Sequence, residues 1–361
     1  MGPKLKSKTC PFDKLRAGSE RSRRIQNLKW RRLIAIGIAF AMSGAVAEAQ
    51  QPGKVPRIGY LGLTSPSANS ARIEAFRQGL RELGYVEGKN IVIEWRHHEG
   101  KLDRLPALAA ELVRLKVDVI VTAGPPAARA AKEATVAIPI VMMQVGDPVG
   151  SGFVASLARP GGNITGLSSL APELSGKRLE LLKEIVPKLS RVAVFGTSTS
   201  PDNAPSLREV ELAAKAFGVT LQYLDIRDAT DPKDIETAFR AASKGRAEAV
   251  LTMVAGAVGA AHQTQILELA IKSRLPVIYT GRGFVEAGGL MSYGVNNTDL
   301  DRHVATYVDK ILKGAKPADL PVEQPRKFEL LINLKTARQI GLTIPSNVLA
   351  RADKVIKEAP G

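Results

Sequence analysis

Residues 57–67, RIGYLGLTSPS, decide the fold when they are set beside residues 191–201, RVAVFGTSTSP. Each stretch has a short apolar run, followed by a loop of small residues, Ser, Thr and Pro. Such a run predicts a strand that is buried on both faces, and the loop predicts a turn into a helix. Because the two stretches lie 134 residues apart, they indicate that a unit of structure occurs twice.

The strand and helix pattern repeats along both halves of the chain. In the first half, strands are expected at residues 57–61, 90–95, 117–122 and 138–143, with helices at 71–83, 105–115 and 127–134. In the second half, strands are expected at residues 191–195, 220–225, 249–253 and 276–280, with helices at 207–217, 234–242 and 260–272. Strands that alternate with helices predict parallel sheets with helices on both faces. The expected fold class is therefore α/β, with two similar Rossmann-like lobes.

Three further segments follow the second half. A short strand is expected at residues 289–294, an amphipathic helix at 299–312, and a strand followed by a helix at 328–342. These segments indicate that more than one hinge strand joins the lobes. We expect lobe I to comprise residues 55–166 and about 295–320, and lobe II to comprise residues 167–294 and about 321–358.

Residues 1–49 are expected to be a basic extension and a signal peptide. A basic cluster at residues 29–32 precedes the apolar run LIAIGIAFAM at 33–42, and small residues with A-x-A cleavage motifs follow up to Ala49. This order is typical of a secretory signal. A membrane-spanning helix is the alternative, but it needs about 20 apolar residues, and Glu48 ends this run earlier. No cysteine directly follows the apolar run, so we do not expect a lipid anchor.

The net charge of +16 invites a nucleic-acid-binding interpretation. Residues 1–32, however, contain eleven Lys and Arg residues against two acidic residues. After cleavage at Ala49 the chain has 40 basic and 32 acidic residues, and the excess is scattered. Nucleic-acid binding needs a clustered basic footprint, so no nucleic-acid partner is expected. The one cysteine, Cys10, precedes the signal, so disulfides and thiolate chemistry are not expected in the mature chain.

The loops that follow the predicted strands are the expected ligand site, because ligands of open parallel sheets bind beyond the carboxyl ends of the strands. The candidate ligand-binding residues are Ser65, Ser67, Asn69, Thr122, Ala123, Gly124, Gly146, Asp147, Ser198, Asn203, Tyr279 and Glu286. Ser and Asn ahead of the first helix of each half can cap that helix and leave its amides facing a carboxylate or another anion. Simple helix capping is the alternative for each of these residues.

Three of these candidates have a second interpretation that the sequence leaves open. Asp147 could balance a ligand ammonium group or orient the turn before Pro148, and Glu286 has the same two interpretations. Tyr279 lies at a strand end, where its ring or hydroxyl could contact a ligand. A tyrosine in that place is also typical of a core residue with one wet edge.

Some segments resemble catalytic or cofactor-binding motifs, but the residues around them do not fit the structure that each motif needs. Residues 150–155, GSGFVA, imitate a dinucleotide-binding fingerprint, but they do not directly follow their strand, and the helical stretch after them is too short. His97 and His98 are adjacent on a predicted strand, so their side chains point to opposite faces and do not share a metal ion. We therefore expect no catalytic residues, no cofactor and no metal site.

Five stretches of the sequence are specific in combination: RIGYLG, FRQGLRELGYVEGKNIVIEWR, RPGGNITGLS, FVEAGGLMSYG and FELLINLKTARQIGLTIP. On these stretches the chain resembles, from about residue 57 to 356, the ABC transporter substrate-binding proteins, a periplasmic family that includes tryptophan-binding members. The resemblance implies a type I periplasmic-binding fold with a multi-strand hinge, ligand contacts from the inter-lobe loops, and no catalysis. Some members have Asp-Pro after the strand that ends here at Met253. This chain has Val254 and Ala255 there, so the resemblance does not imply a polar ligand contact at that place.

The expected protein is a periplasmic receptor, exported through a cleavable signal peptide and not a lipoprotein. It would deliver a small organic solute, an amino acid or a similar carboxylate, to an ABC permease in the inner membrane. We expect a monomer. Two alternatives stay open: a two-lobed enzyme with a nucleotide cofactor, and a ligand-binding partner of a separate sensor.

Overall fold

The computed structural model describes residues 54–62, 70–99, 101–200, 202–226, 231–254, 259 and 262–357. The expected signal peptide and the candidates Ser65, Ser67 and Asn69 lie outside the described residues. The chain divides into two compact units, Met1–Lys54 and Val55–Gly361, and the helices and strands described below all belong to the second unit.

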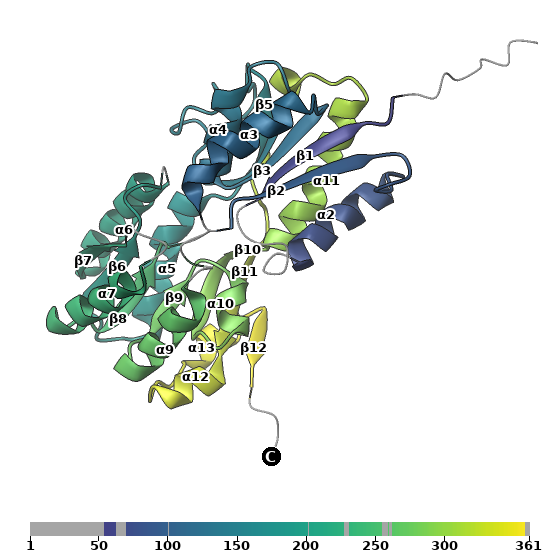
Figure 1. The fold of residues 1–361 in the computed structure, drawn as a ribbon. Helices are drawn as coiled ribbons and strands as arrows, with labels where there is room; N and C mark the ends of the chain where they lie inside the picture. Colours follow the sequence, from purple (N-terminus) through teal and green to yellow (C-terminus); the bar gives the residue numbers. More distant parts are fainter. Residues whose placement is uncertain are drawn as a thin grey trace, which may run out of the picture. The chain divides into compact units, whose positions relative to one another are not determined.

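The first sheet has five parallel strands in the order β2-β1-β3-β4-β5. Their bounds are β1 (Arg57–Gly62), β2 (Val92–His97), β3 (Val119–Ala123), β4 (Ile140–Val145) and β5 (Ile164–Ser168). Helices α2 (Ser70–Glu82) and α11 (Asn297–Leu312) cover one face, and α3 (Leu105–Arg114) and α4 (Pro125–Ala134) cover the other (Figure 1). A 3-10 turn, η1 (Leu102–Arg104), precedes α3. We call this sheet with its helices lobe I.

Helices α2 and α11 pack side by side although they come from opposite ends of the described chain (Figure 1). Gly79 of α2 permits the contact, because a Cβ there would lie 2.2 Å from the backbone oxygen of Arg302. The fully buried carboxylate of Asp301 accepts hydrogen bonds from Arg72 at 2.6 and 3.1 Å and from the Tyr60 hydroxyl at 3.4 Å. An uncompensated buried charge is costly, so this network fixes α11 to lobe I.

The second sheet has seven strands in the order β12-β11-β10-β9-β8-β6-β7. Their bounds are β6 (Arg191–Gly196), β7 (Thr220–Asp225), β8 (Ala249–Thr252), β9 (Val277–Tyr279), β10 (Met291–Val295), β11 (Phe328–Asn333) and β12 (Lys354–Ile356). The β10–β11 pair is antiparallel and the other pairs are parallel. We call this sheet with its helices lobe II.

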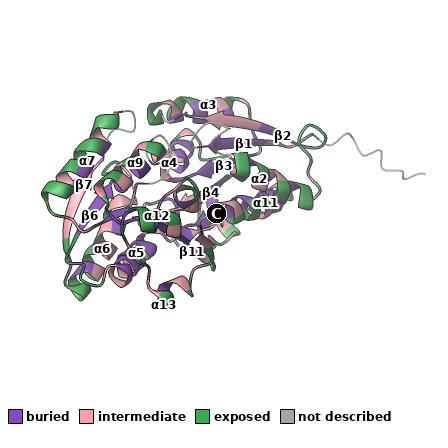
Figure 2. Cartoon of the chain, turned by 90° about the horizontal axis from the view of Figure 1, so that it is seen from below, coloured by how far each residue is buried: buried purple, intermediate pink, exposed green. Residues whose placement is uncertain are grey.

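Two apolar clusters cover the two faces of the lobe II sheet. One contains residues of α5 (Ala171–Ile185), α6 (Asn203–Phe217), α12 (Leu334–Gln339) and α13 (Ser346–Leu349). The other contains residues of α7 (Pro232–Lys244), α9 (Gln263–Ser273) and α10 (Arg282–Glu286). In Figure 2 the strands are mostly buried, whereas the outward faces of the helices are exposed. Burial on both faces explains why these strands read as continuous apolar runs in the sequence.

The chain passes between the two sheets three times. The first crossing joins β5 to α5, the second joins β10 to α11 at Asn296, and the third runs from the 3-10 turn η2 (Pro317–Asp319) to β11. Backbone hydrogen bonds connect the first and third crossings, since Ser168 N donates to Glu323 O at 2.9 Å and Glu323 N donates to Gly166 O at 3.0 Å. The lobe boundaries predicted from the sequence stay a proposal, which these crossings support.

The α/β fold class with parallel sheets is confirmed. Strand β12 was not predicted from the sequence. It has three residues, Lys354–Ile356, and follows the short helix α13. A run of this length carries too little periodicity to be recognised, and it forms because β11 offers it an edge to pair with.

Candidate ligand-binding site

Three candidate residues lie at the end of β3, in the middle of the lobe I sheet. Thr122 and Ala123 are buried strand residues, and Gly124 precedes α4 with a φ of 86°. The N–H of Gly124 donates to the backbone oxygen of Met143 at 2.9 Å, which holds the end of β3 beside the end of β4. Helix α4 begins with two prolines, which lack an N–H, so this helix terminus offers few backbone donors to an anion.

Gln144, near the end of β4, has a strained backbone. The pairing of β4 with β5 shifts register between Met142 and Val145, and Gln144 within this bulge has a φ of 59°, in the left-handed region. Bulges and strain of this kind cluster at binding sites. The side-chain Nε2 of Gln144 and the Oγ1 of Thr122 are both buried and have no hydrogen-bond partner among the described residues. Such an atom costs about 1–3 kcal/mol, so its presence calls for an explanation.

Gly146 is the point at which a lobe I loop meets lobe II. Its N–H donates to Oδ2 of Asp202 at 3.0 Å, and its carbonyl oxygen accepts a hydrogen bond from the Ser168 hydroxyl at 3.4 Å. A Cβ at Gly146 would lie 2.9 Å from both Asp202 Cγ and Pro172 Cδ. Glycine is therefore needed here for a close approach between the loop after β4, the start of α5 and the residue before α6.

Asp147 is half-buried, and its Oδ1 accepts a hydrogen bond from the N–H of Gly150 at 2.8 Å. This contact is the turn-orienting role, one of the two interpretations that the sequence leaves open for this residue. A contact between Asp147 and a ligand stays a prediction.

Asp202 directly precedes α6, and the pKa of its carboxyl is raised. Burial is the main cause that raises the pKa of its carboxyl, and the nearby charges of Asp147 and Glu173 raise it further. The backbone N–H groups of Gly146 and Asp147 oppose this rise. Its second oxygen, Oδ1, is buried without a hydrogen-bond partner in the described part of the chain. Three carboxylates thus give this place a negative potential, which favours a cationic group.

The other lobe II candidates near Asp202 already have partners within their own lobe. The backbone N–H and the hydroxyl of Ser198 donate to Asp225 at 2.8 and 2.6 Å. The side chain of Asn203 accepts from Thr197 N at 3.0 Å and donates to the Tyr223 hydroxyl at 3.0 Å. By contrast, the Oγ1 of Thr197 is a buried oxygen for which the described residues provide no hydrogen-bond partner.

Tyr279 and Glu286 lie in different surroundings from these groups. Tyr279 is buried in an apolar cluster of lobe II, where its ring stacks on Phe284 with a centroid distance of 4.7 Å, and burial raises the pKa of its hydroxyl. The carboxylate of Glu286 accepts from Arg282 at 3.0 Å and from Lys354 at 2.9 Å, and these hydrogen bonds lower its pKa. Both residues are therefore engaged by neighbours within lobe II.

Three residues of the site were missed by the sequence analysis: Gln144, Thr197 and Asp202. Gln144 and Thr197 follow or end a strand in each lobe, as the chosen candidates do, and Asp202 directly precedes a helix. Their position was therefore visible in the sequence. Their lack of hydrogen-bond partners was not, because it depends on residues distant in the chain.

The described residues contain no group of three or more His, Cys, Asp and Glu side chains that could hold a metal ion. They also contain no helix with the length and apolar character needed to cross a membrane.

Comparison with known proteins places the chain in a family. Its sequence matches, over residues 60–356, the family described as ABC transporter substrate binding protein. The chain belongs to this family. A solved structure from Vibrio cholerae, of a conserved domain protein, is 31% identical with a TM-score of 0.77 and covers 84% of this chain and 100% of that chain. The fold is accordingly that of the type I periplasmic binding proteins.

Two further relatives of this substrate-binding chain have named ligands. A solved ABC domain from Streptococcus pneumoniae, in complex with L-Trp, is 27% identical with a TM-score of 0.75 and covers 83% of this chain and 100% of that chain. A curated protein of Clostridioides difficile (strain R20291), described as a tyrosine-binding protein, is 26% identical over 277 residues. That alignment covers 77% of this chain and 78% of the relative.

Proposed function

We propose that this protein is an extracytoplasmic receptor that binds an α-amino acid between its lobes and delivers it to an ABC uptake permease. The observation that carries this proposal is a set of four buried polar atoms without hydrogen-bond partners among the described residues. Lobe I contributes Thr122 Oγ1 and Gln144 Nε2, and lobe II contributes Thr197 Oγ1 and Asp202 Oδ1. The hydrogen bond from the Gly146 N–H to Asp202 Oδ2 supports the proposal, because it joins the loop after β4 to the residue before α6.

The chemistry of these four atoms is complementary to a zwitterion. The Asp202 carboxylate suits an ammonium group, and the negative potential from Asp147 and Glu173 supports that contact. The amide Nε2 of Gln144 is a donor, and the hydroxyls of Thr122 and Thr197 can also donate, so these groups suit a carboxylate. This arrangement differs from the expected pair of helix N-termini, because the carboxylate of Asp202 itself lies at the start of α6.

The relatives support an aromatic amino acid as the first ligand to test. One is described as tyrosine-binding and another was solved with L-Trp, both at about a quarter identity to this chain. We propose L-tyrosine or L-tryptophan as the ligand class.

The proposed mechanism is binding followed by lobe closure, with no covalent step. A ligand that contacts Thr122 in lobe I and Asp202 in lobe II binds best when the two lobes approach, so it favours the closed state. The three crossings are the segments that would bend. We propose that the closed form docks on the permease and that a cleavable signal peptide in residues 1–49 exports the chain.

Calorimetric titration of the mature chain, residues 50–361, tests this proposal with L-tyrosine and L-tryptophan. Two analogues of tyrosine test the contributions of its two charged groups separately. Tyramine lacks the carboxylate, and hydroxyphenylpropionate lacks the ammonium group. We expect at least one amino acid to bind and both analogues to bind about 10-fold or more weakly, because each leaves buried polar groups unpaired. Absence of binding and of thermal stabilisation with any of the standard amino acids would contradict the proposal.

A further inference from the structure

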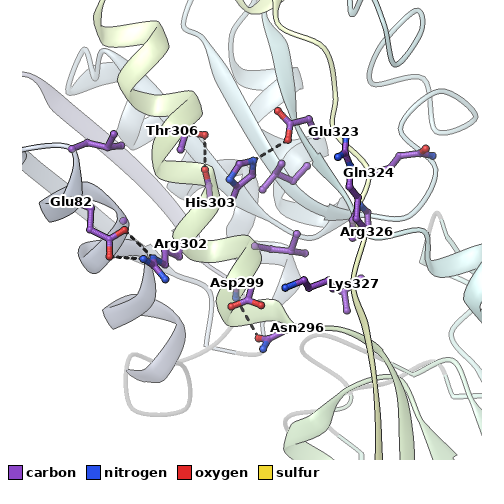
Figure 3. Close-up of a pocket in the computed structure, with 16 residues that line it drawn as sticks. Glu82, Asn296, Asp299, Arg302, His303, Thr306, Glu323, Gln324, Arg326 and Lys327 are labelled. Carbon is purple, nitrogen blue, oxygen red and sulfur yellow. Dashed lines mark hydrogen bonds and ion pairs between the residues drawn. The ribbon is translucent and has the colours of Figure 1, made fainter. Parts of the chain in front are cut away.

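A pocket with a volume of about 500 Å³ lies beside the crossings between the lobes (Figure 3). We call it the hinge pocket. Its walls come from α2, from the first half of α11 and from residues 323–327 of the third crossing, with Leu167 beside the first crossing and Asn296 in the second. The described residues of the candidate amino-acid site do not line it. Its volume falls in the range of small-molecule sites, about 300–1,000 Å³.

The inner wall of the hinge pocket is apolar. Leu167 and Leu300 are buried residues of this wall, and Leu83 and Val295 are partly buried and pack against the same cluster. Pro325 of the third crossing adds to this surface. An occupant of this wall would therefore present an apolar body.

Two of the acidic residues that line the pocket, Glu82 and Glu323, form hydrogen bonds with neighbouring side chains. Glu82 pairs with Arg302 at 2.7 and 2.9 Å, and Glu323 accepts hydrogen bonds at 2.9 Å from His303 and from the Tyr307 hydroxyl (Figure 3). These contacts leave Asp299 as the one acidic wall residue without a direct side-chain contact in the described part of the chain.

The third crossing also carries two cationic side chains that line the pocket. Arg326 and Lys327 are both exposed at the rim, and the described residues provide neither of them with a hydrogen bond or an ion pair. Asp299 and Glu323 balance the two positive charges over the whole lining, but no ion pair joins either carboxylate to Arg326 or Lys327 among the described residues. These two adjacent cations are therefore available to pair with one anionic group.

We propose that the hinge pocket is a second ligand site, which takes a small organic anion with an apolar body, such as an aromatic carboxylate or sulfonate. The apolar wall around Leu83, Leu167 and Leu300 holds the body, and Arg326 and Lys327 hold the anionic group. This site is separate from the amino-acid site, so either proposal can fail without the other.

Fluorescence titration of the mature chain with anilinonaphthalenesulfonate tests the site, because this probe combines an aromatic body with one sulfonate. We expect saturable binding, weakened about 10-fold or more in the double variant Arg326→Gln/Lys327→Gln. The matched control is Arg208→Gln/Lys215→Gln, which removes the same charge from exposed positions of α6. The control should bind the probe as the native chain does.

Two further arms make the result specific. Phenylnaphthylamine, which lacks the sulfonate, should bind more weakly to the native chain and should not distinguish the double variant from it. Gln324→Trp, which adds bulk at the pocket wall, should also weaken binding of the sulfonate. Equal loss in both double variants, equal affinity in all variants, or unsaturable binding would each overturn the proposal. Thermal melts establish that every variant is folded.

Discussion

Small polar residues at the strand ends of the two lobes are alike in sequence but differ in how their hydrogen-bonding groups are satisfied, as Ser198 and Asn203 of lobe II and Thr122 and Gln144 of lobe I show. In lobe II, Ser198 and Asn203 are held by Asp225, Thr197 and Tyr223 of the same lobe. In lobe I, Thr122 and Gln144 are buried at neighbouring strand ends without described partners. Small polar residues in a loop therefore do not identify a binding group by themselves. A buried polar atom that its own lobe leaves unsatisfied is the better indicator.

The largest expected effect comes from Asp202, because it is the acidic group proposed to face a ligand ammonium. Asp202→Asn keeps an oxygen that can accept from Gly146 but removes the charge. We expect affinity for the amino-acid ligand to fall about 10- to 100-fold, as for loss of a charged hydrogen bond of about 1.5–3 kcal/mol. Calorimetric titration measures the change.

The matched control for this variant is Asp231→Asn, which removes a charge at the start of α7, where an amide oxygen can still cap the helix. Its affinity for the ligand should equal that of the native chain. If Asp202→Asn also retains native affinity, the ligand ammonium group does not contact Asp202. An unsatisfied buried atom in lobe II would then not indicate a binding group.

A smaller effect is expected from Thr122→Val, which replaces the unsatisfied hydroxyl by a methyl group of similar shape. Ligand affinity should fall roughly fivefold, for a neutral hydrogen bond of about 1 kcal/mol. The ligand-free protein should melt at the same or a higher temperature, because a buried hydroxyl without a partner is removed. Thermal melts with and without ligand measure both quantities.

Asn203→Ala should give the reverse result. It removes two hydrogen bonds that lobe II makes to itself, so the melting temperature should fall while ligand affinity changes little. A Thr122→Val protein that melts at a lower temperature and binds the ligand normally would show that Thr122 is a structural residue. The unsatisfied hydroxyl in lobe I would then not indicate a ligand contact.

The smallest effect is expected in the pH dependence of stability. The pKa of the Asp202 carboxyl in the folded chain is raised above its ordinary value of 3.8, mainly by burial. The folded state thus binds this proton more tightly than the unfolded chain does. The stability that protonation contributes is present below pH 3.8 and is lost as the pH rises through the raised pKa.

Asn at position 202 has no such titration. The melting temperature of Asp202→Asn relative to the native chain should therefore increase as the pH rises through the folded pKa. Paired melts in ligand-free buffer from about pH 4 to pH 7 measure this difference. A difference that does not change with pH would mean that Asp202 is solvated well enough to titrate normally.

Much of the fold could be predicted because a strand that is buried on both faces is recognisable from a short apolar stretch of sequence. Runs such as those of β1, β3 and β6 are apolar from end to end, and the helices between them keep a polar face. The sequence could not show which residues their neighbours satisfy. Ser198 and Asn203 look alike in sequence to Thr122, but Asp225 and Tyr223, to which they donate hydrogen bonds, lie on β7, 20 or more residues away. Tyr279 likewise reads as a strand-end residue until the packing of Phe284 against it is known.

The close contact between Gly79 and Arg302 has a consequence for the order in which this chain can fold. Lobe I needs α11 to cover the α2 side of its sheet, yet α11 is made after most of lobe II. A nascent chain that ends before Asn297 would leave the partners of Val304, Tyr307 and Val308 facing water. Most of lobe I is therefore synthesised before lobe II, but its core cannot be completed until α11 has been made late in synthesis.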